Sequence, residues 1–286
     1  MSVRPPLGLD HLSVNSMPPL DFARLAAQAG YQSLSLFSEC LSINPFAFPY
    51  WSLVDDAALR RDLRHVLDDL GIGVVVGEGC AIRPDRDVTE CQPIIEAFRE
   101  LGARRLNLLS FEPDLARDFD QMCRFVELAA LMDMDVCIEF SARPGRPKLD
   151  AFMARIDATG MANLSALIDA MHFFAAGHRA EELSAFPLSR LTHLQLCDIR
   201  LDEISDYMEA ALHERLIPGD GSLPLGSLIA ALPPGIGISL EIPQVRASLN
   251  GLAQPDRLRD AASRSRALVE DARAHAATGT TGRGKR

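Results

Sequence analysis

Three features are missing from the sequence: cysteine pairs at metal-binding spacing, an apolar run of membrane-spanning length, and an excess of basic residues. The 6 cysteines are scattered without a CxxC pair, which excludes a zinc ribbon and a disulfide framework. Because no apolar leader follows Met1 and no run could span a bilayer, we expect a cytoplasmic protein that makes no membrane contact. The net charge of -10 argues against nucleic-acid binding, since affinity for the phosphate backbone depends on clustered Lys and Arg.

The glycine-rich turn of dinucleotide-binding folds is also missing after the first predicted strand, which argues against a Rossmann domain. Short apolar runs instead alternate with helical patterns, and they predict strands at residues 9–14, 31–37, 72–77, 104–111, 135–140, 164–169, 191–198 and 236–242. Such alternation requires parallel pairing with helices outside the sheet. Eight units in 286 residues predict an α/β protein, a (β/α)8 TIM barrel, in one domain over residues 1–276. A disordered polar tail is expected at residues 277–286.

The segment LIDAMHFFAAGH, residues 167–178, begins like a buried strand but ends its apolar run at Asp169, with His172 three residues later. By itself this pattern has an ordinary explanation, in which Asp169 caps the next helix and His172 is a surface histidine. Barrel enzymes, however, keep their catalytic residues at the carboxyl ends of strands. The polar residues at the other strand ends therefore decide between the two interpretations.

Each of the fifth to eighth predicted strands carries a charged or imidazole side chain within or at the end of an apolar run: Glu139, Asp169, His193 and Glu241. Such residues are costly to bury unless they are paired or bound to a metal. Three carboxylates and one imidazole directed at one centre predict a site for one divalent ion, Mn²⁺, Mg²⁺, Co²⁺ or Zn²⁺. His193 is the weakest member, because it lies early in its strand and could be a core histidine. Asp198, at the end of the seventh strand, is a candidate for binding substrate.

Two loops after predicted strands carry further candidate substrate-binding residues. The loop at residues 38–52 contains Trp51, the only tryptophan, and three other aromatic residues, which predict a wall of the substrate pocket. The alternative is a loop folded over its own small apolar cluster. The segment HERLIPGDGSLPL places Arg215 before a Pro-Gly-Asp-Gly turn, where a guanidinium could hold a hydroxyl, carboxylate or phosphate of the substrate. The alternative is an exposed arginine that pairs with Glu214 or Asp220.

The chain resembles the xylose isomerase-like TIM barrels in five motifs: Glu on the fifth strand, D-x-x-H after the sixth, H-x-x-x-x-D on the seventh, R-x-x-P-G-[DE]-G before the eighth, and Glu on the eighth. That superfamily includes sugar isomerases and epimerases, inosose and 3-dehydroshikimate dehydratases, and endonuclease IV. The resemblance covers most of the chain in architecture, with its specific motifs in residues 137–243. It implies one divalent cation held by the four strand-end residues named above, and substrate contacts from His172 and Arg215.

The sequence also departs from parts of this family. The extra histidines with which endonuclease IV-like members hold three zinc ions are missing from IGVVVGEG and RLNLLSF, which together with the net charge of -10 argues against DNA repair. Many epimerases carry a second Glu shortly after the fifth-strand Glu, where this chain has only Arg143 and Arg146. The Lys that is common before the seventh-strand Asp is Cys197. These departures favour a more apolar or carboxylated substrate than a simple keto-sugar.

The predicted ligand set implies proton abstraction next to a carbonyl. The cation would polarise a bound hydroxy-ketone and stabilise its enediolate, while Glu139 and Glu241 remove and return the proton from opposite sides. We therefore expect an isomerase or epimerase of carbohydrate metabolism that acts on a small molecule, with a dehydratase of a cyclic keto-polyol as the second expectation. A barrel that only binds a ligand, or serves as a subunit of a larger enzyme, is the alternative of another class. The substrate and the oligomeric state stay open, although barrels of this kind often form homo-oligomers.

Overall fold

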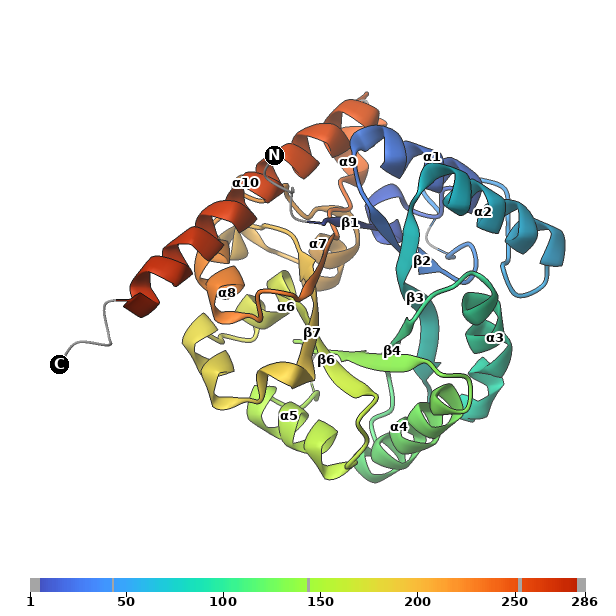
Figure 1. Ribbon diagram of the computed structural model, residues 1–286, viewed down its shortest axis with the longest axis horizontal. Helices are drawn as coiled ribbons and strands as arrows, with labels where there is room; N and C mark the ends of the chain where they lie inside the picture. The colour runs from blue at the N-terminus through green and yellow to red at the C-terminus, as the bar shows by residue number, and fades with distance from the viewer. Residues whose placement is uncertain (1–5, 43, 143–144, 252–253, 282–286) are drawn as a thin grey trace.

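The computed structural model describes residues 6–42, 44–142, 145–251 and 254–281. Its eight strands form a closed parallel barrel in the order β1 to β8, and β1 pairs with both β2 and β8 to close the ring (Figure 1). The strands are β1 (Gly8–Asp10), β2 (Ser33–Phe37), β3 (Gly73–Ile82), β4 (Arg105–Ser110), β5 (Asp135–Glu139), β6 (Leu164–Asp169), β7 (Leu191–Leu196) and β8 (Gly237–Leu240). The predicted TIM barrel is confirmed.

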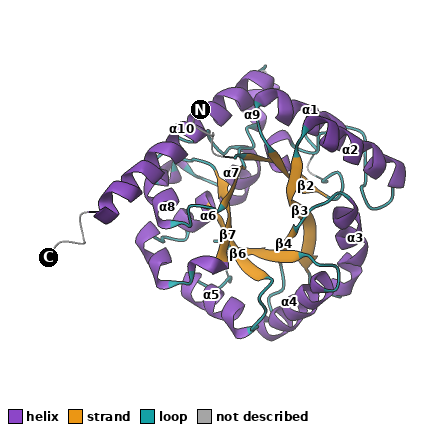
Figure 2. Ribbon diagram, in the orientation of Figure 1, coloured by secondary structure: helices purple, strands orange, loops and turns teal. Residues whose placement is uncertain are grey.

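Ten α-helices are found in the described part of the chain, and they surround the strands (Figure 2). They are α1 (Pro19–Ala29), α2 (Ala57–Leu70), α3 (Gln92–Glu100), α4 (Leu115–Ala130), α5 (Leu149–Ala158), α6 (Ala170–Ala175), α7 (Tyr207–His213), α8 (Leu225–Ala231), α9 (Val245–Leu249) and α10 (Gln254–Thr281). The last helix, α10, packs against both α1 and α8, so it lies beside the first helix of the barrel (Figure 1). Among the described residues, no helix is long and apolar enough to cross a membrane.

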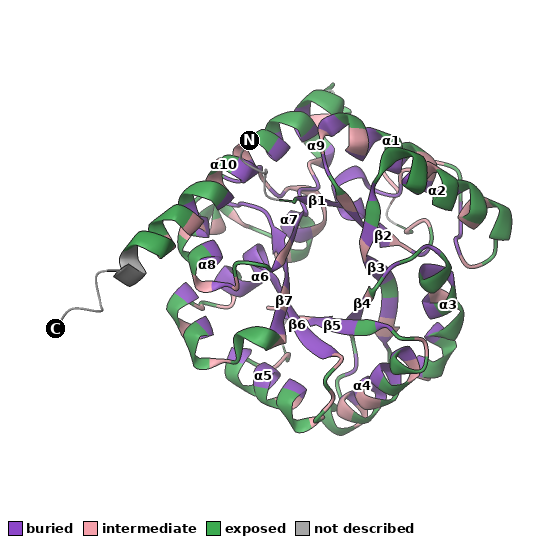
Figure 3. Cartoon of the chain, in the orientation of Figure 1, coloured by how far each residue is buried: buried purple, intermediate pink, exposed green. Residues whose placement is uncertain are grey.

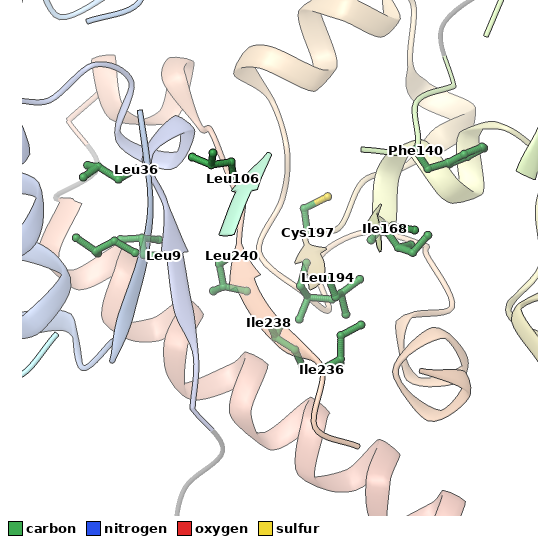
Figure 4. Packing of buried hydrophobic residues seen from close by; sticks show 14 of the residues in the cluster. Leu9, Leu36, Leu106, Phe140, Ile168, Leu194, Cys197, Ile236, Ile238 and Leu240 are labelled. Carbon is green, nitrogen blue, oxygen red and sulfur yellow. The ribbon is translucent and has the colours of Figure 1, made fainter. Parts of the chain in front are cut away.

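Strand side chains alternate between the barrel interior and the surrounding helices, because successive residues of a strand point to opposite faces. Residues such as Ile168 and Leu194 pack in the main core together with the apolar faces of the helices (Figure 4). Val76, Cys137 and Leu167 form a second, small cluster, which lies inside the barrel. Helix surfaces that face the barrel are buried and the opposite surfaces are exposed (Figure 3).

The helix ends follow from local sequence signals. The side chain of Asp56 accepts a hydrogen bond from the backbone N–H of Leu59 at the start of α2, and Asp114 caps α4 in the same way. The residue that follows α2 is Gly71, whose φ of 63° is left-handed and therefore suits glycine.

Two segments differ from the sequence-based expectations. The strand expected at residues 9–14 ends at Asp10, because the Asp10 carboxylate accepts from the N–H of Leu12 and starts a 3₁₀-helix at His11–Val14. Residues 277–281 of the expected tail continue α10, while residues 282–286 lie outside the described residues, as does Arg143.

Candidate active site

A ring of polar side chains lines the inner wall at the carboxyl ends of the strands. It includes Glu78, Glu139, Asp169, Gln195 and Glu241, all buried or nearly so. Each of these five residues lies two positions along the chain after a residue that also faces the barrel interior, because alternate residues of a strand share a face. Two residues of strand add roughly 6–7 Å, so these side chains form a layer nearer the barrel mouth than the apolar cluster inside it. The pairing of Asp169 with Gln195 places both at one level.

Arg215 enters this layer from the loop between β7 and β8. Its Nη1 donates to Asp169 Oδ2 and lies 2.5 Å from Glu241 Oε2, while its Nε donates to the carbonyl of Ala211 at 2.7 Å. The side chain is only 3% exposed. Arg215 is therefore a buried cation shared by two carboxylates, in contrast to the alternative of an exposed arginine. Asp220 pairs with Arg264 instead.

Burial and charge drive the pKa values of these carboxylates in opposite directions. Burial would raise the pKa of Asp169, but the charge of Arg215 and the interactions with His172 outweigh it and hold the pKa at about 2. Burial raises the pKa of Glu241 well above its usual value. The charge of Arg215 lowers this pKa, and the negative charges of Asp10 and Asp169 raise it again. The guanidinium of Arg215 thus favours the ionised form of Asp169, while burial favours the protonated form of Glu241.

A second set of contacts links Glu139, His172 and Tyr207. Glu139 Oε1 lies 3.2 Å from His172 Nε2, and the Tyr207 hydroxyl lies 2.5 Å from His172 Nδ1. Asn107 Nδ2 donates to both Glu139 Oε2, at 3.1 Å, and Glu78 Oε2, at 2.9 Å. A carboxylate, an imidazole and a phenol in this order can hold and move a proton.

Asp169 caps the next helix, as the ordinary explanation of its pattern expects, and also pairs with Arg215, whereas His172 is buried. Asp169 Oδ1 accepts from the N–H of His172 at 2.8 Å and caps α6, while Oδ2 pairs with Arg215. His172 is buried, and its ring contacts Glu139 and Tyr207, so it is no surface histidine. The cap positions the carboxylate for its second partner.

His193 does not reach this group. It pairs in register with Leu167 and lies in the layer below the polar ring, where its Nε2 is 2.9 Å from the Ser239 hydroxyl. Burial lowers the pKa of His193 to about 3, so the ring is neutral at physiological pH. The strand period of two is the reason for the difference, because Gln195 and not His193 stands at the level of Asp169.

The arrangement of the four predicted ligands does not fit a divalent cation. Within the described residues, no three His, Cys, Asp or Glu side chains form a group that could hold a metal ion. Arg215 Nη1 stands where Asp169 and Glu241 would share such an ion, and Glu139 is engaged by His172 and Asn107. In this arrangement the carboxylates bind donors from the protein itself.

Asp198 organises the loop that carries Arg215 and is 2% exposed. Its Oδ1 accepts from the N–H groups of Ile199 and Leu223 at 2.9 and 3.1 Å, and its Oδ2 accepts from Gly219 at 2.9 Å. The carboxylate is thereby occupied by backbone donors, which favours a structural role over the predicted substrate contact.

Trp51 lies in an aromatic stack and not on the polar ring. Its indole N–H donates to the carbonyl of Ser16 at 2.9 Å, and its ring stacks on His11 with centroids 5.3 Å apart. His11 also stacks on Phe22 and Phe37. These contacts join Trp51 to residues outside the loop at residues 38–52, and Trp51 packs in the main core of the protein.

The sequence-based reasoning missed five polar residues of the site: Asp10, Glu78, Asn107, Gln195 and Tyr207. Counting two residues on from the interior positions of β3 and β7 would have found Glu78 and Gln195, since strand alternation places them on the inner wall. Burial raises the pKa of Asp10 to about 7, partly opposed by the hydrogen bond from Gln195. Tyr207 reaches His172 from α7, and no local sequence signal marks that contact.

The chain belongs to the xylose isomerase-like TIM barrel family, whose model matches residues 23–268. Among solved structures, the barrel is similar to the IolI protein with a bound zinc atom, at 16% identity and a TM-score of 0.75, over 93% of this chain and 98% of that one. It is similar to D-psicose 3-epimerase from Clostridium cellulolyticum H10 at 13% identity and a TM-score of 0.69, over 92% and 99%. It is also similar to the probable 3-DHS dehydratase AsbF from Bacillus anthracis, at 11% identity and a TM-score of 0.69, over 90% and 97%. No curated protein matches the sequence.

Proposed function

We propose that this chain is an isomerase or epimerase that acts on a small hydroxy-ketone by proton transfer between Glu139 and Glu241. The observation that carries the proposal is the pair of glutamates on the inner wall, each held by different partners. Asn107 and His172 orient Glu139, whereas Arg215 and Gln195 contact Glu241. The epimerases among the structural relatives support the same reaction class.

Epimerisation needs a base on one side of the substrate carbon and an acid on the other. Glu139 takes the proton from the carbon next to the carbonyl, and the electron pair of that C–H bond forms the enediolate. Glu241, whose protonated form is favoured by burial, returns a proton to the opposite face of the same carbon. Exchange with water then resets the two carboxyl groups. Return of the proton to the neighbouring carbon gives isomerisation instead.

Dehydration is the second candidate, and the contact between Tyr207 and His172 favours it. The phenol and imidazole could protonate a leaving hydroxyl after Glu139 has removed the proton, so that water leaves from the enediolate. The structural similarity to a probable 3-DHS dehydratase is consistent with this reaction.

Solvent deuterium exchange tests the proposal. The protein is incubated in D₂O with a panel of ketoses, inososes and 3-dehydroshikimate, and NMR follows deuterium entering the carbon next to the carbonyl. We expect exchange with at least one compound, and a loss of about 100-fold or more in Glu139→Gln and Glu241→Gln. Glu96→Gln on the exposed face of α3 is the matched control and should keep full activity.

Two results would contradict the proposal. One is binding of panel compounds without any exchange, which would indicate a ligand-binding barrel. The other is exchange at the wild-type rate in both site variants, which would place the chemistry elsewhere.

A further inference from the structure

The charge arrangement at the barrel mouth assigns Arg215 a role beyond that of a substrate contact. We propose that its guanidinium takes the place of a divalent cation between Asp169 and Glu241, and that this chain binds and converts its substrate without a metal ion. The exclusion of metal follows from the geometry of the described residues, and conversion without metal rests on the proposed function.

Arg215 Nη1 occupies the space between the carboxylates of Asp169 and Glu241. This nitrogen donates to Asp169 Oδ2 and lies 2.5 Å from Glu241 Oε2, so it sits between two carboxylates from neighbouring regions of the barrel wall. A divalent ion bound by the same oxygens would need the same space. Its charge would also repel a guanidinium a few ångströms away, in a buried environment where screening is weak.

Hydrogen bonds of the Arg215 side chain and backbone hold its guanidinium in place between the two carboxylates. Its Nε donates to Ala211 at 2.7 Å and its backbone N–H donates to Pro243 at 3.0 Å. The next residue, Leu216, exchanges backbone hydrogen bonds with Asp198, whose carboxylate holds the following loop. The contacts to Asp169 and Glu241 outweigh burial and raise the pKa of Arg215 well above its ordinary value, so the cation is permanent.

The residues around the guanidinium suit it better than they suit a metal. Cys197 Sγ lies 3.7 Å from Nη1, and this small neutral thiol leaves room for the planar cation. Gln195 Nε2 donates to Asp10 Oδ2 and Glu241 Oε1 at 3.1 and 3.4 Å, so amide N–H groups occupy carboxylate oxygens that a metal ion would need. His193, the one imidazole expected among the ligands, is held one layer deeper by Ser239.

One nitrogen of the guanidinium remains for substrate. The contacts of Arg215 with other described residues use Nε and Nη1, and within that part of the chain Nη2 has no hydrogen-bond partner. A fixed N–H donor beside a general acid can stabilise the negative oxygen of an enediolate as the proton leaves the neighbouring carbon. Nη2 would thereby supply the electrophile that the metal was expected to supply.

Metal binding tests the first statement without reference to activity. Wild-type protein, Gln195→His, Arg215→Ala and the double variant are stripped with a chelator, incubated with Mn²⁺ or Zn²⁺, and measured by elemental analysis and titration calorimetry. We expect no site-bound ion in the wild type or in Gln195→His, because Arg215 remains. Arg215→Ala should gain a site for one Mn²⁺ per chain that the wild type lacks, and the added histidine of the double variant should bind that ion more tightly.

A wild-type protein that holds one ion per chain, and loses it in Glu241→Gln, overturns the inference. An ion that the Glu241→Gln variant retains lies elsewhere and leaves the inference intact. If Arg215→Ala does not fold, as judged by its circular dichroism melting curve, the wild-type and Gln195→His measurements still decide the matter.

Activity tests the second statement. Deuterium exchange by the wild type should be unchanged in the presence of EDTA, and Arg215→Lys should lose about 100-fold while it still excludes metal, because lysine keeps one charge but lacks the second nitrogen. Exchange that requires added metal refutes the statement. If no compound shows exchange at all, the proposed function fails, while the metal measurements still judge the first statement.

Discussion

The substitution Asp198→Asn distinguishes a loop anchor from a substrate contact. The side chain accepts three backbone N–H groups, from Ile199, Leu223 and Gly219, at 2.9 to 3.1 Å. Asparagine keeps the shape but turns one acceptor oxygen into a donor. At least one buried N–H then faces another N–H, whichever way the amide is turned.

The magnitude follows from the hydrogen bonds that change. A hydrogen bond to a charged group contributes about 1.5–3 kcal/mol, and a buried donor without a partner costs ~1–3 kcal/mol. The neutral amide would weaken the remaining bonds, because it lacks the negative charge, and would break one or two outright. We therefore expect Asp198→Asn to lower the free energy of unfolding by about 2–4 kcal/mol.

Urea unfolding followed by circular dichroism at pH 7 measures this loss. Asp220→Asn is the matched control in the same loop, since Asp220 forms a half-exposed pair with Arg264 that should contribute less than about 1 kcal/mol. Gly221→Ala should reproduce the loss, because a Cβ at Gly221 would collide with Asp198 Oδ1 and with the backbone nitrogen of Ile199. Deuterium exchange should fall in both Asp198→Asn and Gly221→Ala as Arg215 is displaced.

An Asp198→Asn protein as stable as the wild type would refute this reasoning. If the same variant bound substrate more weakly while its stability was unchanged, the original prediction of a substrate contact would be supported instead.

Two further predictions concern residues outside the polar ring. Trp51→Phe should lower the free energy of unfolding by about 1–2 kcal/mol, because the hydrogen bond to Ser16 is lost. The KM of any substrate found should be unchanged. A raised KM at unchanged stability would instead support the prediction that Trp51 lines the substrate pocket. His193→Gln should flatten the dependence of stability on pH. In the wild type, His193 of the unfolded chain takes up a proton near pH 6.5, whereas the buried ring of the folded protein has a pKa of about 3 and stays neutral. The free energy of unfolding therefore falls as the pH drops below about 6.5, by up to ~1.4 kcal/mol per pH unit. Urea midpoints between pH 7 and 4.5 check this against the exposed control His65→Gln, and equal slopes for His193→Gln and the wild type would contradict it.

The strands of the barrel could be predicted because apolar runs of strand length recur with helical patterns between them. Within the site, Glu139, Asp169 and Glu241 could be predicted for the same reason, since each interrupts or ends an apolar run. His193 satisfied that pattern too, but a strand places alternate residues on opposite faces and successive inward residues at different depths. Its depth depended on the register between β7 and its neighbours, which the sequence of β7 alone does not contain.

The sequence by itself determined the architecture, the family and the presence of several acidic side chains at strand ends, because periodicity and local composition are properties of short segments. Only the tertiary structure decided what those carboxylates bind. Arg215 stands 46 residues along the chain from Asp169, and their contact arises from the closure of the barrel and from a loop held by Asp198. The identity of the cation in the site is therefore decided by packing between distant segments, and not by the spacing of residues along any one of them.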